Sequence, residues 1–337
     1  MPLLTPSAVH IDQPLTNLTI AFNQEPSNFI ADQVFPVVSV PKQSDKYYVY
    51  NQDDSNRTGN VKLLAPRTEV ERIGMQLSTS SYFAEVYGLG ADFSEQDLAN
   101  EDAMLETRAQ QAFDVVNQLR IHREQAFADT FFKTGVWGTE YTGVANADND
   151  TAAEVTQWSD YTNSTPIVDV TTARRTAFLK SGGFDMNTMV VDVETRDILI
   201  NHPDILARLN GGATITNTAL VTNAKLAEIF EVENFFVMKA IANTAAEGLT
   251  AVNGFISSKK AMLVHGPKRA GLRTPAAGLT FAWDSIPGVS GMGITVETFS
   301  DDALKRQQIA EMIQVKMAYD MKVTGANLGV FFNSIVA

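Results

Sequence analysis

The clearest alternation of apolar and polar residues lies near the end of the chain. Between residues 313 and 324, apolar side chains occupy every second position without a break, which is the period of a β-strand with one buried face. We predict that residues 325–327 then turn the chain. We also predict that residues 328–336 pair back on this strand, so that the protein ends in a sheet.

A second pattern predicts one very long helix over residues 94–134. Neither glycine nor proline occurs between Gly90 and Gly135, and Ser94 precedes Asp97 by three residues, which suits a helix cap. Apolar residues recur in steps of three, four and seven and form one stripe. They are Leu98, Leu105, Ala109, Ala112, Val116, Leu119, Ala126 or Phe127, and Phe131. We predict that this stripe packs on the terminal sheet, that the opposite face, including Arg123, stays charged, and that the unbroken helix spans roughly 60 Å.

Residues 46–83 predict a long β-hairpin. A β-rich run at 46–50 leads into a polar tip, and residues 70–83 return with Ile73, Met75 and Leu77 on one face. Charges of both signs flank the tip: Arg57, Lys62, Arg67, Glu69, Glu71 and Arg72. Such a hairpin is either a solvated projection or an interface, and its length leaves both interpretations open.

The first 41 residues predict an extended arm. Six of the twelve prolines lie there, which prevents a long helix and disfavours a central strand. The arm also carries large apolar side chains, among them Phe22 and Phe29, and these supply too much apolar surface to leave in water. We therefore expect the arm to pack on another surface, for which a neighbouring subunit is one candidate.

The middle of the chain alternates helical and strand patterns. Residues 135–143 and the polar run at 146–150 predict a loop boundary. A helical pattern over residues 170–180 then ends at Gly182-Gly183, a C-terminal glycine signal. Further predicted elements are strands at 188–193, 235–241 and 261–264 and helices at 194–200 and 223–230.

Composition narrows the class of protein. The chain has 337 residues, 45% of them hydrophobic and 19% charged. That length indicates two or more domains, and the low charged fraction fits a protein that buries surface against copies of itself. The net charge of -13 argues against nucleic-acid binding through a basic groove. The N-terminal segment matches neither a signal peptide nor a membrane span.

No catalytic or metal-binding pattern stands out. The chain has no cysteine, and its four histidines, His10, His122, His202 and His265, lack the spacing of metal ligands. His122 and Glu124 diverge on a helix, which favours a surface histidine, and the turn at His202-Pro203-Asp204 favours a helix cap over an acid/base pair. We predict no catalytic residue, no metal and no cofactor.

Two glycine patterns also fail as nucleotide sites. Gly266 and Gly271 have phosphate-loop spacing, but Leu272-Arg273 stands where Lys-Ser/Thr is required. Gly291-Met-Gly293 lacks the third glycine of a dinucleotide fingerprint.

The order of parts resembles one known family. A proline-rich arm, a long hairpin, a long helix, an α/β insertion and long terminal strands are similar to a tailed-bacteriophage major capsid protein with the Hong Kong 97-type fold. The most specific stretches run from Glu69-Val-Glu-Arg-Ile73 through Tyr87-Gly-Leu89 to Ser94-Glu-Gln-Asp97, and they look like the family's extended loop entering its spine helix. Gly183-Phe-Asp-Met-Asn-Thr-Met-Val190 and Asn201-His-Pro-Asp-Ile205 look like a strand and helix of its axial domain.

The resemblance implies an α+β fold with a spine helix, an extended β-hairpin loop, a peripheral β-sheet and an α/β axial domain. By segment it implies an arm at 1–41, an extended loop at 42–86, a peripheral domain at 87–140 plus 290–337 with the spine helix at 94–134, and an axial domain at 141–289. It further implies that arm and loop contact neighbouring subunits. The predicted interface residues are Phe22, Phe29, Arg57, Lys62, Arg67, Glu69, Glu71 and Arg72.

The implied function is structural and not enzymatic. Copies of the chain would form pentamers and hexamers that tile an icosahedral virion shell around double-stranded DNA, assembled in the host cytoplasm without a membrane and without sequence-specific DNA binding. Portal and decoration proteins are implied partners. Some members carry a scaffolding segment before the arm, and here the arm begins almost at Met1, which predicts a separate scaffolding protein or prior removal of that segment.

Covalent cross-links are not expected. Some members join a lysine of the extended loop to an asparagine of a neighbour, with a glutamate as catalyst. Lys62 is the only lysine near the loop tip, and no asparagine or glutamate can be assigned as its partner.

Two other classes of protein remain as alternatives. An encapsulin nanocompartment shares the fold but holds a cargo enzyme, and the proline-rich arm favours the phage interpretation over it. An α/β enzyme that uses residues 188–265 is the second alternative.

Overall fold

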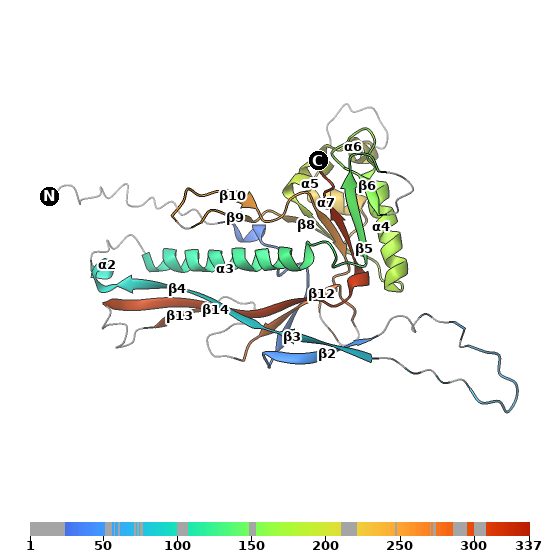
Figure 1. Ribbon diagram of the computed structural model, residues 1–337, viewed down its shortest axis with the longest axis horizontal. Coiled ribbons are helices and arrows are strands. Elements are labelled where there is room, and N and C mark those ends of the chain that lie inside the picture. Colours follow the sequence, from blue (N-terminus) through green and yellow to red (C-terminus); the bar gives the residue numbers. More distant parts are fainter. Residues whose placement is uncertain are drawn as a thin grey trace.

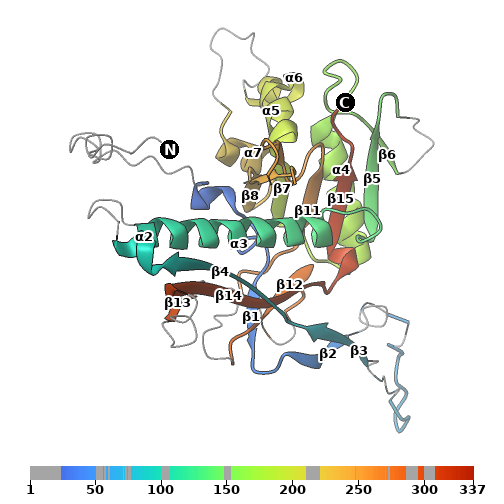
Figure 2. The ribbon, with the colours of Figure 1, turned by 60° about the vertical axis from the view of Figure 1, so that its left-hand side comes forward.

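Two β-sheets and the long helix beside them define the arrangement of the chain (Figure 1). The computed structural model describes residues 24–50, 56, 58–59, 61–70, 72, 74, 77–99, 107–147, 153–209, 221–246, 248–269, 271, 274–285, 295–299 and 308–337. Helix α3 (Thr107–Phe131) runs along the long axis of the molecule, with a five-stranded sheet on one side of it and a six-stranded sheet near its C-terminal end (Figures 1 and 2). The mixture of helices and sheets is the predicted α+β class.

The five-stranded sheet is built around its longest strand. Strand β14 (Ile309–Val323) pairs along one edge with β12 (Gly278–Trp283) and β13 (Thr295–Phe299), and along the other edge with β4 (Glu85–Ser94). Strand β1 (Val37–Val40) pairs with β12. The predicted alternation in β14 is confirmed, and the strand begins four residues before the pattern did. Its buried side chains, including Val315, Met317 and Met321, face the helix α3.

The predicted pairing of residues 328–336 with this strand is wrong. Strand β14 pairs with β4 along one edge and with β13 and β12 along the other, which leaves little free edge for a returning strand. The 3₁₀ turn η3 (Ala326–Leu328) instead directs β15 (Gly329–Asn333) into the six-stranded sheet. Phe331 and Phe332 are fully buried there. Pairing in the six-stranded sheet is therefore favoured because it buries both rings.

The six-stranded sheet collects strands from distant parts of the chain. Its order is β6 (Glu154–Thr156), β5 (Thr139–Val144), β15, β11 (Ala261–Val264), β7 (Thr188–Asp192) and β8 (Asn234–Met238). Helices α4 (Pro166–Ser181), α5 (Val193–Asn201), α6 (Pro203–Leu209) and α7 (Asn223–Ile229) surround it (Figure 2). These helices confirm the predicted α/β pattern, and α4 ends at Gly182, which has a left-handed φ of 77°. The predicted strand at 235–241 is two strands, because β8 ends at Met238 and β9 (Ile241–Asn243) follows.

The loop predicted at residues 135–143 is correct only in its first half. Glu140 Oε1 accepts hydrogen bonds from the backbone N–H groups of Gly135, Val136 and Trp137 at 2.7, 3.0 and 3.1 Å, and these bonds hold a tight turn. From Thr139 the chain is strand β5, parallel to β15. Gly143 lies in this strand. A Cβ there would lie 2.2 Å from the carbonyl oxygen of Ser334, so the close packing requires a glycine, and this glycine does not mark a turn.

The long helix and the hairpin agree with prediction in part. Short helix α2 (Glu95–Ala99) and α3 are separated by residues 100–106, which lie outside the described residues, so the unbroken length stays a prediction. The 25 residues of α3 span about 37 Å at ~1.5 Å per residue. Strand β2 (Ser44–Tyr50) pairs with β3 (Leu77–Phe83). The returning strand thus starts at Leu77, because Val70, Arg72 and Gly74 are not in a strand.

Among the described residues, this arrangement gives two large hydrophobic cores and a small third cluster of Val40, Tyr82 and Phe281. One lies between α3 and the five-stranded sheet and includes Leu119, Phe127 and Phe131 of the predicted stripe, with Val116 packed at its margin. The other lies around the six-stranded sheet and includes Trp158 and Phe332. No helix in the described part of the chain is long and apolar enough to cross a membrane.

Candidate assembly surfaces

The most unusual contact of the long helix is with the arm. Glu124 is fully buried on α3, and its carboxylate faces the backbone of residues 30 and 31. Ile30 N donates to Oε2 and Oε1 at 3.0 and 3.2 Å, and Ala31 N donates to Oε2 at 3.0 Å. Because Val34 N returns to Ile30 O at 3.2 Å, the carboxylate caps one helical turn of the arm, as a side-chain oxygen does at a helix N-terminus.

Burial and hydrogen bonding at this contact change the pKa of Glu124 in opposite directions. Burial raises the pKa of Glu124 to about 7, although the backbone donors at Ala31 and Ile30 and the charge of Arg123 oppose that change. Arg123 is also buried and pairs with Asp32 of the arm at 3.2 Å. The predicted charged face of the helix is therefore wrong at Arg123, which is buried, and the neighbouring Glu124 is buried as well. The arm covers them, and a helical pattern alone cannot show what covers its polar side.

The arm packs on its own chain wherever the structure describes it. Phe35 stacks against Phe127 and Phe131, with ring centroids 6.0 and 4.5 Å apart, and β1 pairs in parallel with β12. Phe29, a predicted interface residue, is only 2% exposed because the chain itself covers it. The chain itself therefore covers most apolar side chains of the described arm, although Val37 remains 40% exposed.

The other predicted interface residues lie on the extended loop between β2 and β3. Lys62, Arg67, Glu69 and Arg72 are exposed, and Arg72 pairs with Glu69 at 3.0 Å. Phe22, Arg57 and Glu71 lie outside the described residues. The loop also exposes Leu63 completely and Val61, Leu64 and Val70 largely, an apolar component that the charge pattern did not reveal. Their role in a subunit interface stays a prediction.

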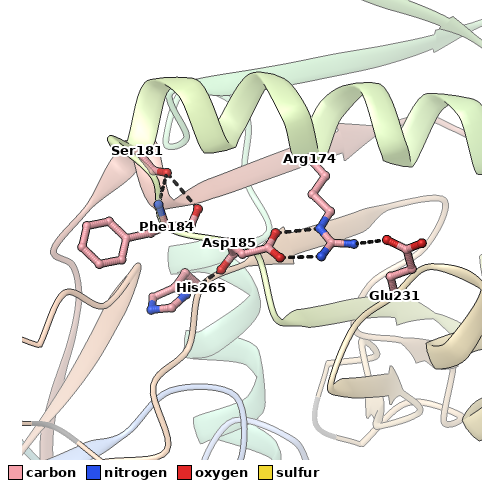
Figure 3. Close-up of polar contacts among 6 residues, drawn as sticks. All are labelled: Arg174, Ser181, Phe184, Asp185, Glu231 and His265. Atoms are coloured by element: carbon pink, nitrogen blue, oxygen red, sulfur yellow. Dashed lines mark hydrogen bonds and ion pairs between the residues drawn. The ribbon is translucent and has the colours of Figure 1, made fainter. Parts of the chain in front are cut away.

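A network of polar contacts fixes the end of helix α4 (Figure 3). Arg174 donates to both carboxylate oxygens of Asp185 and, at 3.0 Å, to Glu231, and these contacts hold the pKa of Asp185 below its usual range. His265 Nδ1 donates to the Asp185 carbonyl oxygen at 2.6 Å, and Ser181 Oγ accepts from Phe184 N at 3.1 Å. The network ties helix α4, the turn after it and the turn after α7 into one rigid corner. Sequence spacing does not predict this network, because its residues lie far apart along the chain.

Beside this corner, apolar side chains lie on the surface. We call Phe178, Leu179 and Phe184 the α4 patch, in which Leu179 is 76% exposed. A second set projects from the hairpin of β9 and β10 (Asn253–Phe255). We call Leu249, Val252 and Phe255 the hairpin patch, in which Leu249 is 71% exposed. Exposed clusters of large apolar side chains commonly mark contact sites.

The described histidines have structural roles. His202 is fully buried, and its Nδ1 accepts from the backbone N–H of Asp204 at 3.2 Å. Burial lowers the pKa of His202, and Ser164 Oγ lies 3.0 Å from its Nε2. The predicted capping role is thus confirmed. His122 is exposed, as predicted, and its ring packs at a tilt against Tyr87 with ring centroids 4.6 Å apart. Within the described ranges no group of three potential metal ligands is present.

Comparisons with known proteins agree on the fold. No protein-family model matches the chain. It is 25% identical over 329 residues to the major capsid protein of Pseudomonas phage JBD67, and the match covers 97% of both chains. Its structure is similar to a phage-related protein of Bordetella bronchiseptica RB50, with a TM-score of 0.65, 17% identity and 93% of each chain covered.

Two further structures bear on the alternatives. The capsid of cyanophage P-SCSP1u has a TM-score of 0.59 at 12% identity, with 94% of this chain and 90% of that one covered. The holo-SrpI encapsulin complex of Synechococcus elongatus PCC 7942 has a TM-score of 0.52 at 10% identity, covering 99% and 96%. The chain therefore has the Hong Kong 97-type fold. The predicted resemblance to tailed-bacteriophage major capsid proteins is confirmed.

Proposed function

We propose that this chain is the major capsid protein of a tailed bacteriophage. The observation that carries the proposal is the end-to-end match with a phage major capsid protein, which leaves almost no part of either chain unaccounted for. The same fold occurs in an encapsulin, but the Pseudomonas phage protein is more similar in sequence, and the Bordetella phage-related protein and the cyanophage capsid are more similar in structure. The function is structural: copies of the chain assemble into a shell.

The proposed domain organisation uses the segments expected from the sequence. We propose an arm at 1–41, an extended loop at 42–86, a peripheral domain at 87–140 with 290–337, and an axial domain at 141–289. The two hydrophobic cores support two centres of folding. Two strands cross these proposed boundaries, since β15 belongs to the six-stranded sheet and β12 to the five-stranded sheet. In this scheme β15 therefore packs with the axial domain and β12 with the peripheral domain.

Pentamers and hexamers are the assemblies that we propose for the shell. A closed shell of one chain needs contacts between different surfaces of neighbouring copies, and repeated modest contacts supply its stability. The exposed apolar side chains of the extended loop support contact with a second copy. A separate scaffolding protein, a portal and decoration proteins complete the proposed particle, which is assembled in the host cytoplasm.

The packaged DNA is proposed to be enclosed and not specifically bound. The net charge of -13 disfavours strong attraction to duplex DNA, which would impede packaging and ejection. Purified shells or capsomers should therefore bind duplex DNA weakly at physiological salt. Tight binding without strong salt dependence would contradict this.

Negative-stain microscopy of the expressed protein tests the shell function. Shells, tubes or capsomers are expected, and a stable monomer at high concentration would overturn the proposal. Genes for a portal and a terminase beside this one would separate a phage head from an encapsulin, whose neighbour would encode a cargo enzyme. On a denaturing gel, intact shells should resolve fully to monomers, and a covalent ladder would contradict the absence of cross-links.

Charge reversal tests the extended loop. The double variant Arg67→Glu, Arg72→Glu should lower the yield of shells while leaving the thermal unfolding of the chain nearly unchanged, because both side chains are exposed. Lys225→Glu, an exposed position on α7, is the matched control. Equal yields from the loop variant and the control would remove the loop charges from the interface.

A further inference from the structure

We propose that the hairpin patch of one copy docks on the α4 patch of the next copy, so that the β9–β10 hairpin and helix α4 form a repeated head-to-tail contact around the capsomer. This inference rests on the proposed shell function and names two surfaces through which neighbouring subunits meet.

The two patches lie on opposite sides of the same region. In Figure 1 the hairpin of β9 and β10 projects to the left of the six-stranded sheet, and α4 runs along its right side. Figure 2 turns the left side forward and agrees with this placement, since α4 then lies behind. Two different patches on opposite sides of one chain cannot meet within that chain. They can meet between copies, and such a contact closes into a ring when the rotation between copies is suitable.

The two patches match in polarity. Glu247 is the one charged residue in the sequence between Ile241 and Phe255, and Leu249, Val252 and Phe255 are 71%, 59% and 45% exposed. On the other side Leu179 and Phe178 are 76% and 43% exposed. Burying such side chains against one another would remove apolar surface from water at both ends of each subunit.

Charges at the edges of the patches are complementary. Arg175 precedes Phe178 by three residues and Leu179 by four, which places it on the same face of α4, and it is exposed. Beside the base of the hairpin, Glu25 is also exposed. Within the described chain neither residue forms an ion pair. A rim pair between Glu25 of one copy and Arg175 of the next fixes the orientation of the contact more than its strength.

Both surfaces are held rigid before contact. The side-chain amide of Gln24 donates to Ile241 O at 2.5 Å and accepts from Ile241 N at 3.0 Å, which fastens the hairpin base to the arm. Asn243 Oδ1 accepts from Ala245 N and Val252 N at 3.0 and 2.9 Å, which stiffens the hairpin itself. The Arg174 network does the same for the α4 patch (Figure 3). Surfaces that are already ordered lose less conformational freedom when they associate.

Site-directed cross-linking tests the contact directly. The natural chain has no cysteine, so introduced thiols are the only ones present. Leu179→Cys and Leu249→Cys are combined in one chain, assembled, and treated with a short bismaleimide. A ladder of covalent multimers that reaches pentamer or hexamer size is expected on a denaturing gel. Each single variant, and the control pair Leu249→Cys with Phe113→Cys, should remain monomeric, because Phe113 is exposed on the distant helix α3.

The outcome separates this contact from the shell function itself. Shells that form normally in the microscope but give no ladder, or a ladder equal to that of the Phe113 control pair, would overturn the inference and leave the shell function intact. Failure of the parent chain to assemble at all would instead overturn the shell function.

A charge swap provides a second measurement. Glu25→Arg or Arg175→Glu alone is expected to reduce assembly yield several-fold through like-charge contact, with unchanged thermal unfolding. The double variant should recover most of the yield. Equal yields from both single variants and the parent chain would count against the proposed orientation.

Discussion

Helices α3 and α4 depart from the simple amphipathic pattern in opposite ways. On α3 two charged side chains, Arg123 and Glu124, are buried, whereas on α4 the large apolar side chains Phe178 and Leu179 are exposed. The first departure is explained within the chain, because the arm covers the polar side of α3 and supplies hydrogen bonds to Glu124. On α4 both side chains stay exposed in the described chain, although Asn56 of the extended loop donates to the carbonyl oxygen of Gly182 just beyond the helix at 3.2 Å. A buried charged side chain thus indicates a partner within the same chain, whereas an exposed large apolar side chain indicates a partner in another copy.

The largest expected effect breaks α3 itself. Val116→Pro removes a backbone donor in the helix interior and brings the ring against the preceding turn, which costs about 3 kcal/mol or more. Because α3 packs on the five-stranded sheet and on the arm, we expect no correct shells. Denaturant unfolding measures the loss of stability, and electron microscopy measures the loss of shells. Normal shells from this variant would contradict the role of the helix in assembly.

A matched pair on α3 separates its buried and exposed sides. Phe131 is fully buried against Phe35 and Trp137, whereas Phe113 is 62% exposed. Phe131→Ala should lower the free energy of unfolding by about 3–5 kcal/mol, and Phe113→Ala should change it by less than about 0.5 kcal/mol. Chemical denaturation checks both values. Similar losses for the two variants would contradict the assignment of the faces.

The contact between Glu124 and the arm should depend on pH. The docked carboxyl has a pKa of about 7, raised by burial from an ordinary value of 4.5, so docking is accompanied by proton uptake between these values. The protonated carboxyl therefore stabilises the docked arm fully below pH 4.5, and this stabilisation is lost as pH rises through about 7. The equilibrium constant for docking changes by at most about tenfold per pH unit.

Hydrogen exchange of residues 29–36, corrected for the intrinsic effect of pH, measures this docking. Arg123 and Asp32 are the charged groups nearest the carboxyl, and they affect its pKa in opposite directions. Glu124→Gln should flatten the pH dependence, and Gln125→Ala, an exposed neighbour, should preserve it. Protection that increases with pH in the natural chain would reverse the assigned sign.

The smallest effect is expected at the α4 corner. Arg174→Ala removes a partly exposed ion pair with Asp185 and Glu231, which contributes about 0–1 kcal/mol to stability. Its effect on assembly should exceed its effect on folding, because the network positions Phe184 in the α4 patch. Thermal unfolding compared with shell yield tests this, and proportional losses in both would reduce the network to a folding role.

The sequence predicted elements well where a repeating pattern exists. Strand β14 has strict alternation, and α4 ends at a glycine pair, so periodicity and backbone freedom identify both. The order of parts also led to the correct fold, although family resemblance and not periodicity carried that step. The apolar stripe of α3 was correct at Leu119, Phe127 and Phe131.

Other features depend on contacts that no local pattern contains. The sheet joined by β15 is decided by which edges are free, and β14 is already paired on both sides. Glu124 resembles any solvated helix residue until the N–H groups of Ile30 and Ala31 are placed beside it. The α4 corner joins residues 174, 185, 231 and 265. Because these residues are so far apart in the sequence, no short motif or periodic spacing predicts their contact.

The pairing of β4 with β14 has a mechanical consequence. Ten residue pairs join these strands along most of their length, and both strands run roughly along the long axis of the molecule (Figure 1). Tension along that axis shears the two strands past each other. Their hydrogen bonds then carry the force together and do not break one after another. A subunit stretched in this direction should resist far more force than one peeled at β13, whose five pairs with β14 lie at the margin of the sheet.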